Sequence, residues 1–242
     1  MTLQKNDFVE IEFTGKIKDT GEIFDSNIKS DLESSGLNRQ DAKPFVFSLG
    51  QGMFLPGIDE FLTGKPETPS KYQIELNPEK AFGPRQSQLV QLMPMKVFAV
   101  QKVRPIPGAM FNFDGRIGKV LSVSGGRVMI DFNNPIAGKT VIYDVNFLRK
   151  VEDTNEKIKY FINFLFRRDL NFKMDADKII LEVEKSMVQF VKLFEDKFKE
   201  LFGVGLEVTE MAEKAKEAVQ EAVGEKTLDE VEDISKEADK AE

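Results

Sequence analysis

The side chains that could do chemistry in this chain are carboxylates, lysines, hydroxyls and aromatic rings, because its 242 residues include no histidine and no cysteine. An imidazole base, a Ser-His-Asp relay and a His-ligated zinc ion are therefore excluded. The lack of cysteine also excludes disulfides and thiol nucleophiles. An enzyme built from this sequence either uses the remaining polar groups or catalyses a reaction that needs no proton transfer.

Most segments of the first 151 residues have the pattern of β-strands. Residues 7–17 alternate apolar and polar side chains and are rich in aromatic and β-branched residues. Glycines and polar residues mark turns between the apolar runs, and residues 27–43 are polar and are predicted to form a loop. A short helix is predicted at residues 56–62. The further predicted strands are 22–26, 44–50, 71–76, 96–103, 116–123, 127–132 and 140–151.

Beyond Asp153 the apolar spacing becomes helical. Residues 156–170 and 186–202 are each predicted to form one amphipathic helix. Three strands are predicted around them, at 171–176, 178–184 and 204–208. This order predicts a separate α+β domain of about 55 residues, which is near the lower size limit for independent folding. A homodimer through this domain is one way to cover its aromatic helix faces.

Charge is distributed unevenly along the sequence. Residues 210–242 contain 12 acidic and 5 basic residues, which equals the net charge of −7 of the whole chain. Residues 84–138 contain seven basic residues and only two acidic ones. A basic segment and an acidic tail can attract each other, or the basic segment can serve acidic partners.

Five short blocks occur in order in the part predicted to be β-rich. They are VEIEFTG with DTGEIFDS at 9–26, PFVFSLG at 44–50, FLPGI at 54–58, NPEKAFG at 77–83 and VIYDV at 141–145. Together they closely resemble the FKBP family of peptidyl-prolyl cis/trans isomerases. Five blocks in the same order are far more specific than any single glycine motif.

The segment between the last two blocks resembles the insert-in-flap domain of SlyD-like members of that family. The similar phrases are LVQ at 89–91, PMKVF at 94–98 and DFNNPIAG at 131–138. The helix-and-strand region after it is similar to that of long archaeal-type members. The resemblance implies an α+β fold in which an antiparallel sheet wraps on a short helix, with an inserted small all-β domain and a C-terminal α+β domain. The expected parts are residues 1–83 with 138–153, 84–137, 154–209 and the tail 210–242.

The resemblance also implies a catalytic pocket with a carbonyl-binding group. The backbone N–H of Leu55 is expected to hold the substrate carbonyl, and Asp25 is expected to orient the pocket through hydrogen bonds. Phe82 stands where family members often have tyrosine, and Ile58 stands where many have tryptophan. Loss of one phenol hydrogen bond, worth ~0.5 to 1.5 kcal/mol, reduces the rate without requiring inactivity. The expected wall residues are Phe13, Phe24, Phe45, Phe54, Leu55, Ile58, Phe82 and Tyr143.

Prolyl isomerisation suits this composition because it makes and breaks no bond to hydrogen. The implied partners are unfolded or partly folded polypeptides that contain proline, and no cofactor or metal is expected. The alternative is a holdase-type chaperone with a vestigial isomerase pocket. The four methionines of the insert, Met93, Met95, Met110 and Met129, suit contact with unfolded chains but equally suit a small core.

Other partners and locations follow from what the sequence lacks. It contains no apolar run of the ~18 residues needed to span a bilayer and no signal-peptide pattern at its start, so a cytoplasmic protein without membrane contact is expected. Nucleic acid is not expected as a partner, because the aromatic residues of the basic insert form no RNP or OB signature.

Overall fold

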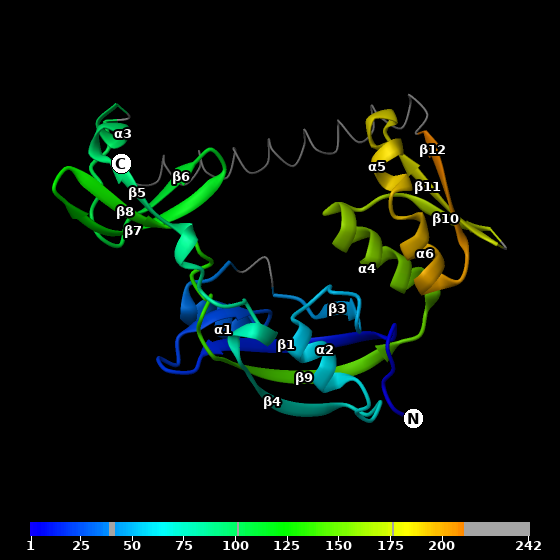
Figure 1. Ribbon diagram of the computed structural model, residues 1–242. Helices are drawn as coiled ribbons and strands as arrows, with labels where there is room; N and C mark the ends of the chain where they lie inside the picture. Colours follow the sequence, from blue (N-terminus) through cyan, green and yellow to red (C-terminus); the bar gives the residue numbers. More distant parts are fainter. Residues whose placement is uncertain (39–41, 101, 176, 211–242) are drawn as a thin grey trace, which may run out of the picture. The chain divides into compact units, whose positions relative to one another are not determined.

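The computed structural model describes residues 1–38, 42–100, 102–175 and 177–210 (Figure 1). The chain divides into two compact units, Met1–Val151 and Glu152–Glu242. Apart from Glu210, the predicted acidic tail lies outside the described residues. In the part of the chain that is described, no helix is long and apolar enough to cross a membrane.

The main sheet of the first unit has five antiparallel strands, with β1 at its centre. Strand β1 pairs with β9 along its whole length. On its other edge β1 pairs with β3 over its first half and with β2 over its second half. The strands are β1 (Phe8–Ile17), β2 (Ile23–Ser26), β3 (Phe45–Ser48), β4 (Ser70–Leu76) and β9 (Val141–Val151).

Alternation along β1 and β9 gives this sheet one apolar and one polar face. Ile11, Phe13, Tyr143 and Val145 are buried, whereas the residues between them are polar and only partly covered. Helix α2 (Pro56–Leu62) buries Ile58 and Leu62. Proline at its first position fixes a helical φ angle and needs no N–H partner there. These elements confirm the predicted α+β class with an antiparallel sheet and a short helix.

One helix occurs where the sequence predicted a loop. Helix α1 (Lys29–Ser35) buries only Leu32 and ends at Gly36, which has a φ of 71° and donates its backbone N–H to the Leu32 carbonyl. A single apolar residue in a polar segment leaves no periodic signal, so the prediction of a loop at 27–43 was wrong for this part. The short 3-10 helices of this unit are η2 (Pro78–Lys80) and η3 (Ser87–Leu89).

The inserted segment forms its own four-stranded antiparallel sheet in the order β5-β8-β7-β6. Its small core contains Phe98, Val120, Val128 and Ile130. A hydrogen bond joins the segment that enters the insert to the segment that leaves it. The Gly138 N–H donates to the Gly83 carbonyl at 2.8 Å. The elements are β5 (Val90–Pro94), α3 (Met95–Val100), β6 (Met110–Phe113), β7 (Arg116–Ser124) and β8 (Arg127–Asp131).

The prediction of a strand at residues 96–103 was wrong, because Met95–Val100 form helix α3. Met95 and Phe98 are three residues apart, a spacing that puts them on the same face of a helix. Phe98 is fully buried there, and Met95 packs against the same core. Strands β5 and β6 were not predicted. The β-branched residues of 96–103 favoured a strand locally, but burial of the Phe98 ring against Phe111 and Phe113 occurs in the helical form.

The second unit contains a three-stranded sheet in the order β10-β11-β12, with β11 and β12 parallel. Its first helix begins after Asp153, whose side chain accepts a hydrogen bond from the Glu156 N–H at 2.7 Å. The predicted single helix at 186–202 is instead divided into α5 and α6, and the Phe194 ring at the break packs on Phe166. The elements are α4 (Thr154–Phe166), β10 (Phe172–Asp175), β11 (Lys178–Val183), η4 (Lys185–Met187), α5 (Val188–Lys192), α6 (Glu195–Phe202) and β12 (Gly205–Glu210).

Candidate functional site

Seven aromatic rings from distant parts of the first unit form one continuous group, here called the ring cluster. Phe13 contacts Phe54 with 5.0 Å between ring centroids and Tyr143 with 5.8 Å. Phe24 extends the group, with centroid distances of 5.9 Å to Tyr143 and 5.5 Å to Phe82. The structure therefore brings together all six aromatic residues of the predicted site. The ring cluster consists of Phe13, Phe24, Phe45, Phe47, Phe54, Phe82 and Tyr143.

Burial divides the predicted site into a covered base and a partly exposed rim. Phe13, Ile58 and Tyr143 are buried, with exposed fractions of 6%, 0% and 0%. The remaining predicted wall residues, Phe24, Phe45, Phe54, Leu55 and Phe82, are half-buried. The rim can therefore offer apolar ring surface to a molecule outside the protein, while the base fixes where the rim side chains stand.

Gly15 lets the rings approach the strand that carries Phe13. A Cβ atom at Gly15 would lie 2.8 Å from Tyr143 Cζ and 3.1 Å from Phe24 Cζ. Real side chains do not come so close, so any other residue at position 15 would displace one of these two rings. The glycine of the TG pair in the first block thus has a packing role at this site.

Tyr143 and Asp25 form the polar contact of the ring cluster. The Tyr143 hydroxyl donates to Asp25 Oδ2 at 3.1 Å. Strand pairing positions both residues, because Gly15 of β1 lies opposite Asp25 on one side and Tyr143 on the other. Burial and the adjacent Asp25 carboxylate raise the pKa of Tyr143 above its ordinary value. Tyr143 therefore stays a neutral hydrogen-bond donor over the physiological range.

Leu55 precedes the first turn of α2, where backbone N–H groups lack partners within the helix. Its carbonyl accepts the N–H groups of Ile58 at 3.0 Å and Asp59 at 3.2 Å. No hydrogen bond from the Leu55 N–H is found among the described residues. Because the Leu55 side chain is only half-buried, this position combines a free donor with apolar surface beside Phe54.

Sequence reasoning missed two residues that support the ring cluster. Phe47 is fully buried and lies 5.4 Å from Phe54, and its spacing of two from Phe45 in PFVFSLG was the available signal. Asn27 is buried, and its side-chain amide binds the backbone of β1 at the two residues that flank Glu12. Its Oδ1 accepts the Phe13 N–H at 2.7 Å, and its Nδ2 donates to the Ile11 carbonyl at 3.1 Å. No local pattern in the sequence pointed to Asn27.

A buried carboxyl on α2 was also missed. Asp59 is only 7% exposed, and burial raises its pKa to about 6, although hydrogen bonds from the backbone N–H groups of Gly50 and Gly52 act to lower it. The available signal was an acidic residue directly after the buried Ile58 in a short amphipathic helix. Asp59 is thus a buried carboxyl next to Ile58, which closes the base of the site.

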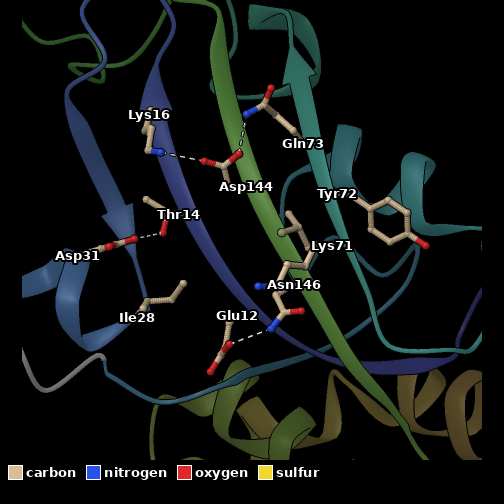
Figure 2. A pocket seen from close by; sticks show the side chains of 11 residues that line it. Glu12, Thr14, Lys16, Ile28, Asp31, Lys71, Tyr72, Gln73, Asp144 and Asn146 are labelled. Atoms are coloured by element: carbon tan, nitrogen blue, oxygen red, sulfur yellow. Dashed lines mark hydrogen bonds and ion pairs between the residues drawn. The ribbon is translucent and has the colours of Figure 1, made fainter.

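The opposite face of the same sheet carries a polar hollow of about 520 Å³ (Figure 2). Each acidic side chain that lines it has a hydrogen-bond partner in the same hollow. Asp144 contacts Lys16 at 2.8 Å and Gln73 at 2.8 Å, and these hydrogen bonds lower the pKa of Asp144. Thr14 donates to Asp31, and Asn146 donates to Glu12 at 3.0 Å. Since the ring cluster lies on the other face, this hollow includes none of the predicted site residues.

The insert exposes much apolar surface, here called the insert surface. Eight of the twelve exposed large apolar side chains in the described part of the chain belong to residues 90–130. Leu92 of β5 lies opposite Met129 of β8, so both project from the sheet face that is turned away from the insert core. The insert surface consists of Leu92, Val100, Val103, Ile106, Met110, Ile117, Leu121 and Met129.

The same insert also carries positive charges without an acidic partner among the described residues. Arg85 pairs with Asp131 at 2.7 Å and Arg116 lies over the Phe132 ring, but the other five cations of the insert have no acidic partner among the described residues. All five are exposed, and they are Lys96, Lys102, Arg104, Lys119 and Arg127. A hollow of about 490 Å³ next to α3 is lined by apolar side chains, prolines and Arg104.

The described acidic side chains do not form a metal site. No group of three or more Asp or Glu residues in the described part of the chain is arranged to hold a metal ion. The prediction that the protein needs no cofactor or metal stays a prediction.

Comparison with known proteins identifies two families along the chain. Residues 1–103 match the family described as FKBP-type peptidyl-prolyl cis-trans isomerase. Residues 91–136 match the family described as FKBP26, IF domain. The first match covers four blocks of the predicted site, and the second covers the insert sheet.

The curated relatives are named as peptidyl-prolyl cis-trans isomerases. The short-type peptidyl-prolyl cis-trans isomerase of Methanocaldococcus jannaschii is 26% identical over 153 residues, which are 62% of this chain and 93% of that protein. A probable FKBP-type 16 kDa isomerase of Pseudomonas fluorescens is 33% identical over 111 residues, which are 45% of this chain and 73% of the relative. The SlyD isomerase of Treponema pallidum is 29% identical over 156 residues, covering 62% of this chain and 79% of the relative.

Proposed function

This chain belongs to the FKBP-type peptidyl-prolyl cis-trans isomerases, and we propose that it accelerates rotation about X–Pro bonds at the ring cluster. One observation supports the ring cluster as the place of this reaction. A rim of half-buried rings surrounds a buried base, beside a Leu55 N–H that has no partner among the described residues. Residues 1–83 with 138–153 form the proposed catalytic domain.

The reaction needs an environment rather than an acid or a base. Rotation about an X–Pro bond has a barrier of ~18 to 20 kcal/mol, because amide resonance is lost as the bond twists. Surfaces without water disfavour the more polar planar amide, and fixed donors stabilise the carbonyl in the twisted state. A site without histidine or cysteine can supply both effects.

Each part of the site has a proposed role. The rim rings enclose the substrate proline, and Ile58 with Phe13 closes the base. The Leu55 N–H donates to the carbonyl of the residue before the proline. Asp25 accepts a hydrogen bond from the Tyr143 hydroxyl and so keeps the Tyr143 ring in its edge-to-face contact with Phe24. Phe82 supplies ring surface but no hydroxyl donor.

A peptide assay tests this assignment. Catalysis of cis/trans exchange in a proline-containing tetrapeptide, and of a refolding reaction limited by prolyl isomerisation, should fall at least tenfold in Phe24→Ala and Asp25→Ala. Asp19→Ala is a matched control, since Asp19 is exposed in the turn before β2. Full activity in both site variants would refute the role of the ring cluster.

We further propose that the insert, residues 84–137, works as an insert-in-flap domain that binds unfolded chains and supplies them to the ring cluster. Its exposed apolar side chains and five unpaired cations favour client segments in which apolar residues alternate with acidic ones. Local delivery raises the concentration of substrate prolines without changing the chemistry. Deleting 84–137 should reduce activity on a refolding protein far more than on a tetrapeptide, and equal losses would contradict delivery.

A holdase with a weak isomerase site is the second candidate. Two observations favour it: Phe82 has no phenol hydroxyl, and the insert exposes eight large apolar side chains whereas the rim residues of the ring cluster are half-buried. In this case the protein suppresses aggregation of an unfolded client but leaves the slow refolding phase unchanged. The same refolding assay separates the two candidates.

The remaining assignments concern place and assembly. We propose a cytoplasmic protein that acts on proline-containing polypeptides, with no membrane or nucleic-acid partner. For residues 154–209 we propose a separate domain and a homodimer through it, because Phe190 and Leu193 are 48% and 76% exposed. Sedimentation of the protein with and without Leu193→Glu tests the dimer.

A further inference from the structure

Two chain segments that are bonded to each other connect the insert to the main sheet, and they are here called the joint. The joint consists of residues 83–89, which lead into β5, and residues 131–138, which begin at the last residue of β8. No residue of these two described segments is fully buried. Apolar packing therefore contributes less here than in a core, and polar contacts decide how firmly the segments are held together.

Asp131 is the centre of these polar contacts. Its Oδ2 accepts two hydrogen bonds from the Arg85 guanidinium, at 3.0 Å from Nε and 2.7 Å from Nη2. Its Oδ1 accepts two from Asn133, at 2.9 Å from the backbone N–H and 2.7 Å from Nδ2. Both oxygens of the carboxylate are thus occupied. Hydrogen bonds to a charged acceptor are roughly twice as strong as those between neutral groups.

Asn133 crosses from one segment of the joint to the other. Its Oδ1 accepts the Gln86 N–H at 2.8 Å, and its Nδ2 donates to the Gln86 carbonyl at 3.0 Å. A facing residue makes the same two hydrogen bonds in a pair of antiparallel strands. The side-chain amide of Asn133 therefore extends the pairing of β5 with β8, in which Val90 lies opposite Asp131.

The joint is continuous with the proposed catalytic site. Gly83 directly follows Phe82, one of the rim rings. The Gly83 carbonyl accepts the Gly138 N–H at 2.8 Å, and the Gly83 N–H donates to the Pro78 carbonyl at 2.7 Å. Position 138 favours glycine, because its φ is 78° and a Cβ atom there would lie 3.1 Å from Arg85 Cβ. The segments that carry the insert thus end next to a wall residue of the site.

We propose that Arg85, Asp131 and Asn133 are positioning residues that restrict the movement of the insert relative to the ring cluster. This inference rests on the proposed function, because restricted movement matters only if the insert supplies clients to the site. A client bound to a restricted insert stays within a small volume. If a loosened joint doubles the reach of the insert, that volume rises about eightfold and the local concentration of client prolines falls by the same factor.

Substitution of Asn133 tests this role, and the next residue offers a matched control. Asn133→Ala removes both hydrogen bonds to Gln86 and one to Asp131. It should slow catalysed refolding limited by prolyl isomerisation about fivefold to tenfold, while kcat/KM on a tetrapeptide and the affinity for an unfolded client stay unchanged. Asn134→Ala removes the acceptor of the Ile136 N–H, a bond of 2.8 Å within one segment, and should keep full refolding activity.

Substitution of Arg85 provides a second test. The Arg85 side chain is 49% exposed, so Arg85→Ala leaves no cavity and should give the same pattern as Asn133→Ala. Arg85→Lys keeps the charge but not the two-bond contact, and its refolding activity should lie between those of Arg85→Ala and the original protein. A loss of client affinity equal to the loss of refolding activity in both alanine variants would overturn the proposal, because these residues would then maintain the insert fold itself.

Amide hydrogen exchange tests the joint without any activity. The Gly138 N–H bonds to Gly83 and not to Asn133, so Asn133→Ala accelerates its exchange only if the joint opens as a whole. The exchange at Gly138 should become at least about fivefold faster, whereas that of the Val128 N–H in the insert core should not change. An unchanged rate at Gly138 would overturn the proposal.

Comparison with the protein that lacks residues 84–137 separates this inference from the proposed delivery. If the deletion lowers refolding activity but Asn133→Ala does not, delivery takes place and the joint has no positioning role. If the deletion lowers refolding and tetrapeptide activity equally, the proposed delivery and this inference fail together.

Discussion

The ring cluster and the insert surface are both apolar, but they differ in how their side chains are held. The rings contact one another at fixed angles over a buried base, and a single hydrogen bond orients the Tyr143 hydroxyl. The insert surface is made mainly of methionine and aliphatic side chains that project from a small sheet among unpaired cations. Rigid rings suit one repeated chemical group, whereas flexible side chains suit many different sequences.

The two regions also differ in their use of acidic groups. Asp59, next to Ile58 in α2, is a buried carboxyl with its pKa raised to about 6. Asp131 is one of the two acidic residues of the insert, and there burial is outweighed by hydrogen bonds from Asn133 and Arg85, so its pKa is lowered. Folding therefore favours the protonated form of Asp59 and the ionised form of Asp131, and this gives the two regions opposite responses to pH.

The largest expected effect is on stability. Because the pKa of Asp59 is 3.8 when unfolded and about 6 when folded, its contribution to the free energy of unfolding is lost as the pH rises from 4 to about 6. The loss amounts to about 3 kcal/mol and changes little at higher pH. Asp59→Asn should remove this dependence. Urea unfolding of both proteins at pH 4, 5, 6 and 7 measures the difference, and parallel curves would show that Asp59 is not buried as described.

The second effect concerns packing at the ring cluster. Gly15→Ala forces Tyr143 or Phe24 aside, and a displacement costing ~1 to 3 kcal/mol lowers kcat/KM on a tetrapeptide roughly fivefold to 150-fold. Binding of an unfolded client to the insert surface should not change. Thr20→Ala in the exposed turn serves as the control. If Gly15→Ala weakened client binding as much as catalysis, the two regions would not be independent.

The third effect concerns the insert surface. Leu92→Ser with Met129→Ser removes two facing apolar side chains, each worth on the order of 1 kcal/mol when covered, and should weaken client binding about 30-fold. Tetrapeptide catalysis should stay the same. Met174→Ser is a suitable control because Met174 is also exposed, but in the second unit. Fluorescence anisotropy with a labelled unfolded protein measures binding, and unchanged affinity would remove these residues from the client site.

The smallest effect separates ring surface from hydrogen bonding within the ring cluster. Tyr143→Phe keeps the ring but loses the hydrogen bond to Asp25, which is worth ~0.5 to 1.5 kcal/mol and corresponds to about twofold to tenfold in kcat/KM. Tetrapeptide kinetics at constant ionic strength measure this change. A loss as large as that of Gly15→Ala would mean that Asp25 does more than orient the Tyr143 ring.

The structure agrees with sequence expectation where the signal is local and periodic. Strands β1 and β9 alternate buried and polar residues as the sequence does, and α2 begins at Pro56 and ends at Leu62 as predicted. Expectation failed for α3, where β-branched residues favoured a strand but the Phe98 ring is buried in a helical turn. It failed for α1 because one apolar residue, Leu32, produces no pattern.

The site divides in the same way. The family resemblance named Phe13, Phe24 and Tyr143, and these residues are in contact. It did not point to Asn27, whose buried amide holds β1, because a lone asparagine after a strand is usual in turns. Neither did it point to Asp59, because the pKa of a carboxyl depends on the residues that bury it.

The sequence by itself determined the kind of reaction: without histidine or cysteine, and with the motif blocks of an isomerase family, the chain is suited to catalysis that moves no proton. It also determined the alternating strands, since a period of two is a property of neighbouring residues. Only the tertiary structure decided which rings meet, why Gly15 must be small and why the Asp59 carboxyl is buried. Contacts between residues distant in the sequence depend on the packing of all the elements at once, and no local pattern records them.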